Sequence, residues 1–514
     1  MTDTDSKSSV NYKIIILGLV IFTLMVSFLD LVPGNKGVTI TAAIAVLMAI
    51  WWVSEALPIG ITSLLPIILF PAFGVLDGKT ISNAYINDVI FLFLGGFFMA
   101  LALEKWGLHK RIALKILSSL GGSPFKILLG FMLASAFLSM WMSNTATAMM
   151  MLPIVFSVTT ALEDTHGEQK LGKFTTAILL GVAYACSIGG IATLVGTPPN
   201  LSFIRIFEII YPSAPEISFG QWLIYALPLS ILMFVFVLVI LYFLFPPQKD
   251  IEVLNKSFFN EKYKELGKVT LEQKRVFVLF VLLALLWVFS KTLSIGEFKI
   301  PGWSGLFPEP KFLNDGTIAI FVTILLFITP SSKKTEGLLT WEIINKIPWG
   351  IVLLFGGGFA LAKGFVDSGL SSYIGEQLVS AGNLSNMSLL FTVTGLMTFL
   401  TEFTSNTATT EMMLPIVAGL TNQIQINPLF LMIPVTIAAS MAFMFPIATP
   451  PNAVVFGSGK LKMMDMVKAG FIINIVGVIL VVLISYYWGA IVFDIDPNVM
   501  PEWAKDIRLG ATLK

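Results

Sequence analysis

One twelve-residue stretch occurs twice in this chain, and this repeat limits the possible folds more than any other feature. SNTATAMMMLPI begins at Ser143 and SNTATTEMMLPI begins at Ser405, 262 residues later, and ten of the twelve positions agree. Each copy places three small polar residues directly before an apolar run. A duplicated junction of this kind predicts an internal duplication of the chain.

Two further pairs of stretches follow in the same order. FLGGFFMALALEKWGL begins at Phe93 and FGGGFALAKGFVDSGL begins at Phe355, again at an offset of 262 residues. GTPPN begins at Gly196 and ATPPN begins at Ala448, at an offset of 252, and a shortened loop accounts for the difference. Three motifs in one order predict two homologous halves.

The composition places both halves in a membrane. Of the 514 residues, 56% are hydrophobic and 12% are charged, and the charged fraction is about half of that in soluble domains. Apolar runs such as Leu229 to Phe245 are continuous, whereas the strands of a β-barrel would alternate. We therefore expect an all-α polytopic membrane protein.

Hydropathy and the repeat together predict 11 transmembrane helices and two re-entrant hairpins, the latter centred on the SNT motifs. Each half then crosses the membrane five times, and because five is odd the two repeats have inverted topology. After a first helix at 14–32, the expected segments are 39–54, 59–75, 88–106, 126–160, 174–210 and 222–245, then 272–293, 315–330, 347–366, 386–421, 428–458 and 469–493. The corresponding domains are an N-terminal helix (1–35), a first repeat (36–246), a cytoplasmic linker (247–271), a second repeat (272–493) and a C-terminal tail (494–514).

The positive-inside rule orients the chain. Of the 32 Lys and Arg, 22 fall in segments that lie inside if the N-terminus is cytoplasmic. We expect a multi-pass protein of the inner or plasma membrane, with the N-terminus in the cytoplasm and the C-terminus outside.

The SNT and TPPN motifs interrupt apolar segments. Pro198 cannot donate a hydrogen bond and restricts Thr197, so free backbone groups remain in the middle of the run. Irregular backbone at membrane depth is tolerated only where it is buried or lines a cavity. Matching interruptions in inverted halves point to a transporter binding site near the bilayer midplane.

The residues at these interruptions suit an anion with two charged ends. Hydroxyls, amides and helix N-termini bind anions, and the duplication supplies one cradle for each end, which favours a small dicarboxylate. Neither motif contains Lys or Arg, so we expect bound cations to help neutralise the two negative charges of the substrate. Ser139 and Thr401 each lie one helical turn before an SNT serine, and their hydroxyls add ligands for two sodium-sized cages.

Paired SNT motifs, paired TPPN loops and inverted halves resemble the divalent anion:sodium symporter (DASS) family, over nearly the whole chain after residue 35. The resemblance implies a secondary active transporter of C4 and C5 dicarboxylates (succinate, malate, fumarate, 2-oxoglutarate) with Na⁺ as the coupling ion. It also implies a homodimer with a fixed scaffold and a moving transport domain, an elevator-like form of alternating access. The family further includes carriers of sulfate and citrate, and this alternative stays open.

The resemblance also implies the site residues. One end of the substrate is expected at the first SNT and TPPN motifs and the other end at the second, which gives Ser143, Asn144, Thr145, Thr197, Pro198, Ser405, Asn406, Thr407, Thr449 and Pro450. The first sodium is expected at Ser139, Ser143, Asn144 and the Gly196 carbonyl, and the second at Thr401, Ser405, Asn406 and the Ala448 carbonyl.

Two carboxylates break the symmetry of the repeat. Glu402 and Glu411 stand where the first half has Met140 and Met149. An ionisable group at membrane depth is a functional candidate, so both are candidates for coupling, beside the simpler interpretation that they are structural or solvated near the outer mouth. The family contains sodium symporters and sodium-independent exchangers, and a dicarboxylate exchanger remains the alternative.

Other function classes are disfavoured. One cysteine and two histidines, His109 and His166, do not suffice for a transition-metal centre, and we expect both histidines in solvated inner loops. No enzyme activity is expected, because the intramembrane carboxylates lack His or Lys partners at helical spacing. The sequence has no GxxxxGK[ST] phosphate loop for ATP and no basic patch with interleaved aromatics for nucleic acid. Inverted repeats without a carbonyl filter motif argue against an ion channel.

Overall fold

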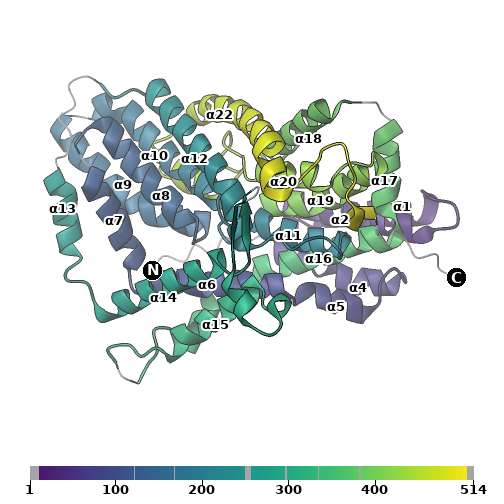
Figure 1. Cartoon of the computed structure of the whole chain (residues 1–514). Helices are drawn as coiled ribbons and strands as arrows, with labels where there is room; N and C mark the ends of the chain where they lie inside the picture. The colour runs from purple at the N-terminus through teal and green to yellow at the C-terminus, as the bar shows by residue number, and fades with distance from the viewer. Residues whose placement is uncertain are drawn as a thin grey trace.

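The part of the chain that the structure describes forms a bundle of helices with one short pair of antiparallel strands (Figure 1). The structure is a computed structural model, and it describes residues 11–120, 122–166, 168–248, 256–295, 298–333, 335–380 and 384–505. The positions expected for the two chain ends concern residues outside these ranges.

The helices of the first half and the linker are α1 (Tyr12–Phe28), α2 (Lys36–Ser54), α3 (Ile59–Thr62), α4 (Leu65–Ala72), α5 (Gly78–Tyr85), α6 (Asp88–Lys105), α7 (Leu108–Leu120), α8 (Pro124–Ser139), α9 (Asn144–His166), α10 (Glu168–Ile191), α11 (Pro198–Ile210), α12 (Phe219–Leu244) and α13 (Lys256–Glu265). The second half has α14 (Leu271–Val288), strands β1 (Leu293–Ile295) and β2 (Phe298–Ile300), α15 (Asp315–Ile328), α16 (Trp349–Ser368), α17 (Leu370–Ser380), α18 (Asn386–Leu400), α19 (Asn406–Gln423), α20 (Leu429–Ala438), α21 (Pro450–Phe456), α22 (Met463–Ile484), α23 (Ala490–Phe493) and α24 (Glu502–Lys505).

The predicted apolar segments are helical. Among the described residues, seven helices are long and apolar enough to cross a bilayer, and shorter apolar helices of 10–17 residues accompany them. The short helices include α8, α18 and α20, which belong to the segments that the SNT and TPPN motifs interrupt. The all-α membrane fold is therefore confirmed, whereas the number of crossings stays a prediction.

Each SNT motif lies at the bend between two helices. In the first half α8 ends at Ser139 and α9 begins at Asn144, and in the second half α18 ends at Leu400 and α19 begins at Asn406. The Ser143 hydroxyl caps α9 by accepting a hydrogen bond from the Ala146 amide at 3.2 Å. The first N–H groups of a helix have no partner within it, so both bends carry oriented donors.

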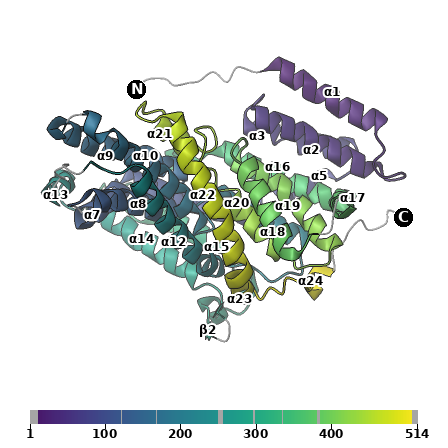
Figure 2. The same cartoon turned by 90° about the horizontal axis from the view of Figure 1, so that it is seen from above.

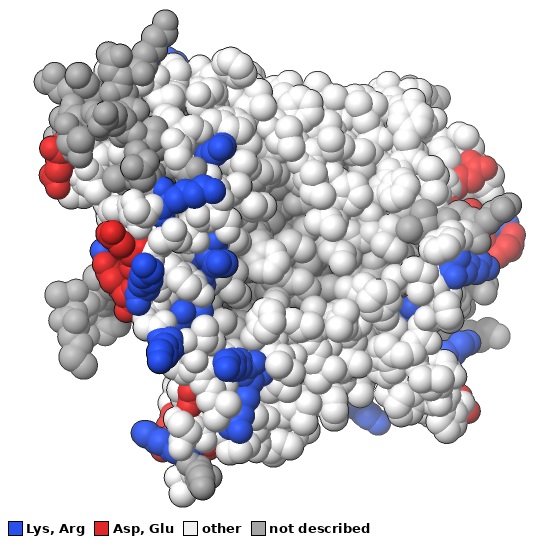
Figure 3. All heavy atoms as spheres, turned by 60° about the vertical axis from the view of Figure 1, so that its left-hand side comes forward, with Lys and Arg blue, Asp and Glu red and all other residues white. Residues whose placement is uncertain are grey.

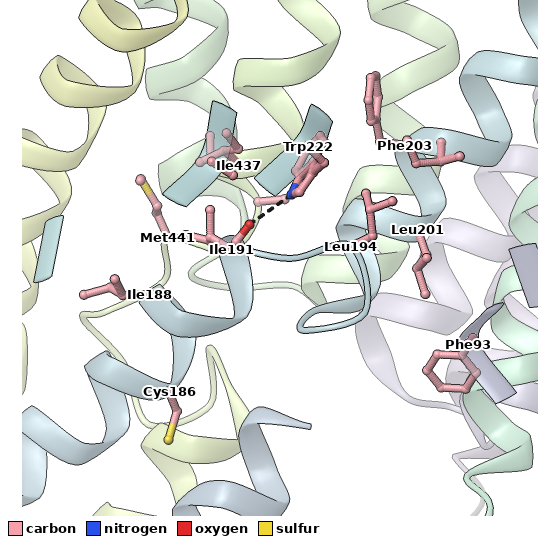
Figure 4. Close-up of a cluster of buried hydrophobic side chains, with 14 of the residues drawn as sticks. Phe93, Cys186, Ile188, Ile191, Leu194, Leu201, Phe203, Trp222, Ile437 and Met441 are labelled. Carbon is pink, nitrogen blue, oxygen red and sulfur yellow. Dashed lines mark hydrogen bonds between the residues drawn. The ribbon is translucent and has the colours of Figure 1, made fainter. Parts of the chain in front are cut away.

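The TPPN motifs break two long apolar segments at the expected residues. α11 begins at Pro198 and α21 at Pro450, where a proline costs no helical hydrogen bond. The end of α10 is braced from α12, because the buried Trp222 indole nitrogen donates to the Ile191 carbonyl at 3.1 Å. Figure 4 shows this bond among buried apolar side chains that also include Ile437 of α20.

The broken segments of the two halves interlock. α9 packs on α21 and α19 packs on α11, so each helix that follows an SNT motif contacts the broken segment of the other half. Tyr184 on α10 donates from its hydroxyl to the Phe443 carbonyl, within the second break, at 2.8 Å. The fold thus gathers motifs that are far apart in the sequence.

Three of the helices that the predicted spans did not include lie at the two ends of the bundle. α7 and α13 lie at one end and α17 at the opposite end in both views (Figures 1 and 2). α13 falls within the predicted linker and docks on α7, where the Arg111 guanidinium lies 5.2 Å from the centre of the Tyr263 ring. α7 follows the first glycine-rich stretch and α17 follows the second, so these two helices occupy equivalent positions in the two halves.

Candidate functional site

The first SNT bend carries a cluster of oxygen-bearing groups. One end of the Asn144 amide lies 2.5 Å from the Ser139 hydroxyl oxygen, 3.0 Å from the Cys186 carbonyl oxygen and 3.3 Å from the Gly196 carbonyl oxygen. If this end of the amide is the nitrogen, it donates hydrogen bonds to these three oxygens. If it is the oxygen, four oxygen atoms converge on one point, and small hard cations prefer oxygen ligands of this kind. The structure thus brings together Ser139, Asn144 and Gly196, which the sequence grouped as a sodium site.

Two glycines allow this close approach. A Cβ on Gly190 would lie 2.6 Å from Asn144 Oδ1, and a Cβ on Gly196 would lie 2.5 Å from the Gly190 carbonyl oxygen. Any side chain at either position would push the end of α10 away from the amide.

The second SNT bend repeats the arrangement. The Thr401 hydroxyl oxygen lies 2.7 Å from Asn406 Oδ1 and 2.9 Å from the Ala439 carbonyl oxygen. Thr401 therefore corresponds to Ser139, Asn406 to Asn144, and the Ala439 carbonyl to that of Cys186. A second oxygen cluster with the same chemistry stands in the second half.

Sequence reasoning missed the carbonyls of Cys186 and Ala439. A signal was present, because ACS at 185–187 and AAS at 438–440 match each other shortly before GTPPN and ATPPN. Ser143, Ser405 and the Ala448 carbonyl remain predicted ligands. Ala448 is buried and lies directly before Thr449, the N-cap residue of α21.

The TPPN loops are held by their asparagines. Asn200 donates from its amide nitrogen to three carbonyls at the end of α10, at 2.7 to 3.3 Å. Asn452 donates to the Ala442 and Phe445 carbonyls at 3.1 Å. Thr197 and Thr449 are buried N-cap residues, and the following prolines, Pro198 and Pro450, are half-buried and exposed, respectively. The asparagines therefore hold the two loops in place. The substrate contacts expected of Thr197, Pro198, Thr449 and Pro450 stay predictions.

Four helices begin at these motifs, and three of them, α9, α11 and α19, are longer than ten residues. Their N-termini carry positive partial charge and free N–H groups, which favour an anion. Ser143, Asn144 and Thr145 are half-buried, as are Ser405 and Asn406, and only Thr407 is buried. The bends thus combine accessible hydroxyls and amides with helix ends.

Glu402 is buried and clamps the second break. Its carboxylate accepts hydrogen bonds from the Phe443, Met444 and Phe445 amides at 2.7 to 3.2 Å. Asn474 of α22 donates to it as well, at 2.6 Å. The Glu402 side chain is fully buried, so the expected solvation near the outer mouth is wrong, while a structural role and a role in coupling stay predictions.

Glu411 is also fully buried, so solvation at the outer mouth is wrong for it too. The Ser202 hydroxyl of α11 donates to Oε1 at 3.1 Å, while Oε2 has no hydrogen-bond partner among the described residues. A Cβ on Gly358 of α16 would lie 2.0 Å from Oε2, so the carboxyl packs directly on a glycine backbone.

A cavity of about 820 Å³ opens between α7, α9 and α13. Its lining includes Met142 and Ala146, which flank the first SNT motif, together with the exposed Lys110 and the half-buried Lys262. Figure 3 shows the face that carries these helices, with a hollow at its middle and Lys and Arg side chains beside it. The first bend is therefore reachable from this end of the molecule.

The expected solvation of His109 is wrong. The side chain is 4% exposed, and one ring nitrogen lies 2.8 Å from the Leu103 carbonyl oxygen. Burial lowers the pKa of His109. The side chain of His166 lies outside the described residues. Within the described ranges, no group of three or more His, Cys, Asp or Glu could hold a metal ion.

Comparison with known proteins gives close relatives. The sequence matches the family described as "sodium:sulfate symporter transmembrane region" over residues 9–495. It is 42% identical to the sodium-dependent dicarboxylate transporter SdcS of Staphylococcus saprophyticus over 496 residues, which cover 94% of this chain and 92% of that protein. The SdcS protein of Staphylococcus aureus strain NCTC 8325 is also 42% identical, with the same coverage.

Two solved structures share the fold. MtrF of Neisseria gonorrhoeae, described as illuminating a class of antimetabolite efflux pumps, matches with a TM-score of 0.53 and 15% identity, covering 91% of this chain and 97% of that chain. The YdaH transporter of Alcanivorax borkumensis matches with a TM-score of 0.55 and 14% identity, covering 93% and 98%. At these identities the likeness concerns the fold alone.

Proposed function

The chain belongs to the sodium:sulfate symporter family, as the motifs indicated, and we propose that it moves C4 and C5 dicarboxylates such as succinate across the membrane together with Na⁺. It is a multi-pass membrane transporter. The observation that carries the proposal is the pair of matching oxygen clusters, Ser139 with Asn144 and Thr401 with Asn406, each at the start of a helix.

Each SNT motif holds one carboxylate of the substrate. The serine and threonine hydroxyls and the asparagine amide donate hydrogen bonds to it, and the helix N-terminus stabilises its charge. Thr197 with Pro198 and Thr449 with Pro450 complete the two cradles. Because the cradles stand in different halves, a dianion with two separated ends satisfies both.

Sodium and substrate act on the same asparagine amides. When the oxygen of Asn144 turns toward a cation with Ser139 and the Cys186 and Gly196 carbonyls, its NH₂ group must point away from the cluster. That NH₂ group then donates to a carboxylate at the SNT tip. The same argument holds for Asn406, with Thr401 and the Ala439 carbonyl. Each bound cation therefore favours the amide orientation that binds substrate, and the reverse follows by linkage.

Sodium coupling is favoured over sodium-independent exchange. The relatives with 42% identity are named sodium-dependent dicarboxylate transporters, and both oxygen clusters have neutral oxygen donors suited to Na⁺. Exchange, and transport of sulfate or citrate, are the alternatives that the experiment below separates.

The working arrangement is a homodimer in which each chain has two inverted repeats, 36–246 and 272–493, and in which a transport domain moves against a fixed scaffold by elevator-like alternating access. The linker in 247–271 joins the repeats on the cytoplasmic side. Lys and Arg gather on the face that carries α7, α9 and α13 (Figure 3), which supports that face as the inner one.

Uptake of radiolabelled succinate into proteoliposomes tests the function. We expect accumulation in empty vesicles under an inward sodium gradient, and competition by malate, fumarate and 2-oxoglutarate but weaker competition by sulfate or citrate. Uptake that ignores sodium and needs internal dicarboxylate would instead establish exchange. Uptake of sulfate or citrate with succinate as the weaker competitor would refute the proposed substrate class.

A further inference from the structure

The two halves pack differently around their SNT helices. In the second half α17 lies tightly along α19, and a Cβ on Gly375 would lie 2.5 Å from the Gly419 carbonyl oxygen. In the first half the cavity of about 820 Å³ is lined by α7 and α9, the corresponding pair. This conformation is therefore open beside α9 and closed beside α19.

Met149 and Glu411 occupy equivalent positions in these two environments. Both are the seventh residue of the repeated stretch. Met149 lines the cavity and is 57% exposed, whereas Glu411 is 0% exposed. Inverted repeats exchange their environments when a transporter changes the side to which it opens. In the opposite conformation, the position of Glu411 then lines a cavity and Met149 is covered.

The closed environment of Glu411 does not suit a charge. Its Oε1 accepts one hydrogen bond, from Ser202 of α11, and its Oε2 has no partner among the described residues. Oε2 faces the backbone of α16 at Gly358. A buried carboxylate with one neutral hydrogen-bond donor is strongly unfavourable, and a protonated carboxyl is the form that such a site accepts.

The elements packed against Glu411 supply no compensating cation. On α11 the nearest charged residue in sequence, Arg205, pairs with Glu208 at 3.0 Å and with Asp88 of α6 at 3.6 Å. From α5, Tyr85 is the titratable group that interacts with Glu411, and its hydroxyl donates to the Ser63 carbonyl.

The other helices packed on α19 are no better placed. α16 presents Gly358 to Glu411, and its charged residues Lys363 and Asp367 pair with each other. α20 carries no charged residue. α17 carries Tyr373 and Glu376, but it packs on α19 around Gly419, about two helical turns after Glu411. The charged residue of α2 is Lys36, at the first position of that helix.

We propose that Glu411 is a proton-binding site that must be loaded for the second half to close. It is deprotonated by water when the cavity beside α19 is open, and it takes up one proton there before α16 and α11 cover it. No bond other than that to the proton changes. The proposal rests on the proposed function, because closure of this half is one step of alternating access.

The proton reaches Glu411 from one side only. With the cavity beside α9 facing the cytoplasm, the cavity beside α19 opens to the outside, so the external pH sets the loading of Glu411. Above the pKa of an accessible carboxyl, each unit of external pH lowers its protonated fraction about tenfold. Sodium-driven uptake is therefore expected to fall by up to about tenfold per unit of external pH where closure limits the rate.

The test is uptake by right-side-out vesicles at external pH between about 6.5 and 8.5, where the carboxyls of succinate are ionised, with internal pH varied separately. We expect the wild type to respond to external pH alone. Glu411→Gln, which mimics the protonated form, should remain active with a flat profile, and Glu376→Gln, which changes an exposed carboxylate on α17, should behave as the wild type. Glu411→Met installs the first-half residue and provides a second neutral variant if the Gln variant misfolds.

An external pH profile shared by the wild type and a folded neutral variant would overturn the proposal, as would an equal response to internal pH. Infrared spectroscopy supplies a readout that needs no transport. Purified protein at neutral pH should show the carbonyl stretch of a weakly hydrogen-bonded carboxylic acid, and Glu411→Gln should lack it. Absence of that band in the wild type refutes proton binding at Glu411, whereas a band without any dicarboxylate uptake refutes only the proposed function.

Discussion

Replacing Glu402 with Gln should destabilise the backbone segment that carries the Ala439 carbonyl of the second oxygen cluster. The Glu402 carboxylate accepts hydrogen bonds from three consecutive backbone amides, at residues 443–445, and from the Asn474 side chain. These amides lie in the break between α20 and α21, the same segment that carries the Ala439 carbonyl. Glutamine has nearly the same shape but only one acceptor oxygen.

The cost can be worked from these contacts. If the glutamine oxygen takes the place of Oε1, its NH₂ group faces the Phe445 amide, whose only described acceptor is Oε2. A buried donor left without a partner costs about 1–3 kcal/mol. The remaining bonds lose their charge assistance, about 1 kcal/mol each, and the smaller desolvation cost of a neutral amide offsets part of the sum. We expect a net loss of about 2–4 kcal/mol in the free energy of unfolding.

Two measurements check this expectation. Thermal unfolding of purified Glu402→Gln should occur at a clearly lower temperature than that of the wild type. Half-maximal uptake should need about tenfold more sodium for every 1.4 kcal/mol lost at the second cluster. Glu502→Gln, whose side chain is 88% exposed, provides the control and should change neither value. If Glu402→Gln keeps the stability and the sodium dependence of the wild type, the Glu402 carboxylate does not hold the segment at residues 443–445 in place.

Three other predictions concern the site and its orientation. Asn144→Ala and Asn406→Ala should each lower succinate uptake at least about tenfold while leaving folded protein in the membrane, because each loses a group shared by cation and substrate; wild-type uptake in either variant would contradict the two-cradle arrangement. Ser139→Ala should raise the sodium concentration for half-maximal uptake more than the succinate concentration, and equal shifts would argue against a cation ligand. A cysteine at Lys256 should react with impermeant reagents only from the cytoplasm and one at Leu306 only from outside, so labelling from the opposite sides would reverse the orientation.

Breaks and bends could be predicted from the sequence because their causes are local. Proline cannot continue a helical hydrogen-bond ladder, so Pro198 and Pro450 begin new helices where TPPN predicted them. The pairing of Ser139 with Asn144, and of Thr401 with Asn406, follows from short spacing around one bend. Because the two halves are repeats, a break or bend predicted in one half predicts the equivalent break or bend in the other.

Contacts between segments could not be predicted in the same way. Backbone carbonyls carry no side-chain signature, so those of Cys186 and Ala439 were missed. The burial of Glu402 depends on three amides some forty residues further along the chain. The Lys and Arg of α7 predict a solvated inner loop, whereas one face of this helix is apolar and buried, and His109 is buried with it. α17 and the strands β1 and β2 were likewise too short or too polar for a hydropathy pattern.

The single thiol of this chain, that of Cys186, is fully buried (Figure 4). The backbone carbonyl of the same residue faces the first oxygen cluster. A buried thiol is shielded from alkylating reagents and spin labels. Introduced pairs of cysteines can therefore be labelled in an otherwise native chain, with little background. Distances between nitroxides on α7, α9, α17 and α19, measured by electron paramagnetic resonance, would then follow the opening of one half and the closing of the other directly.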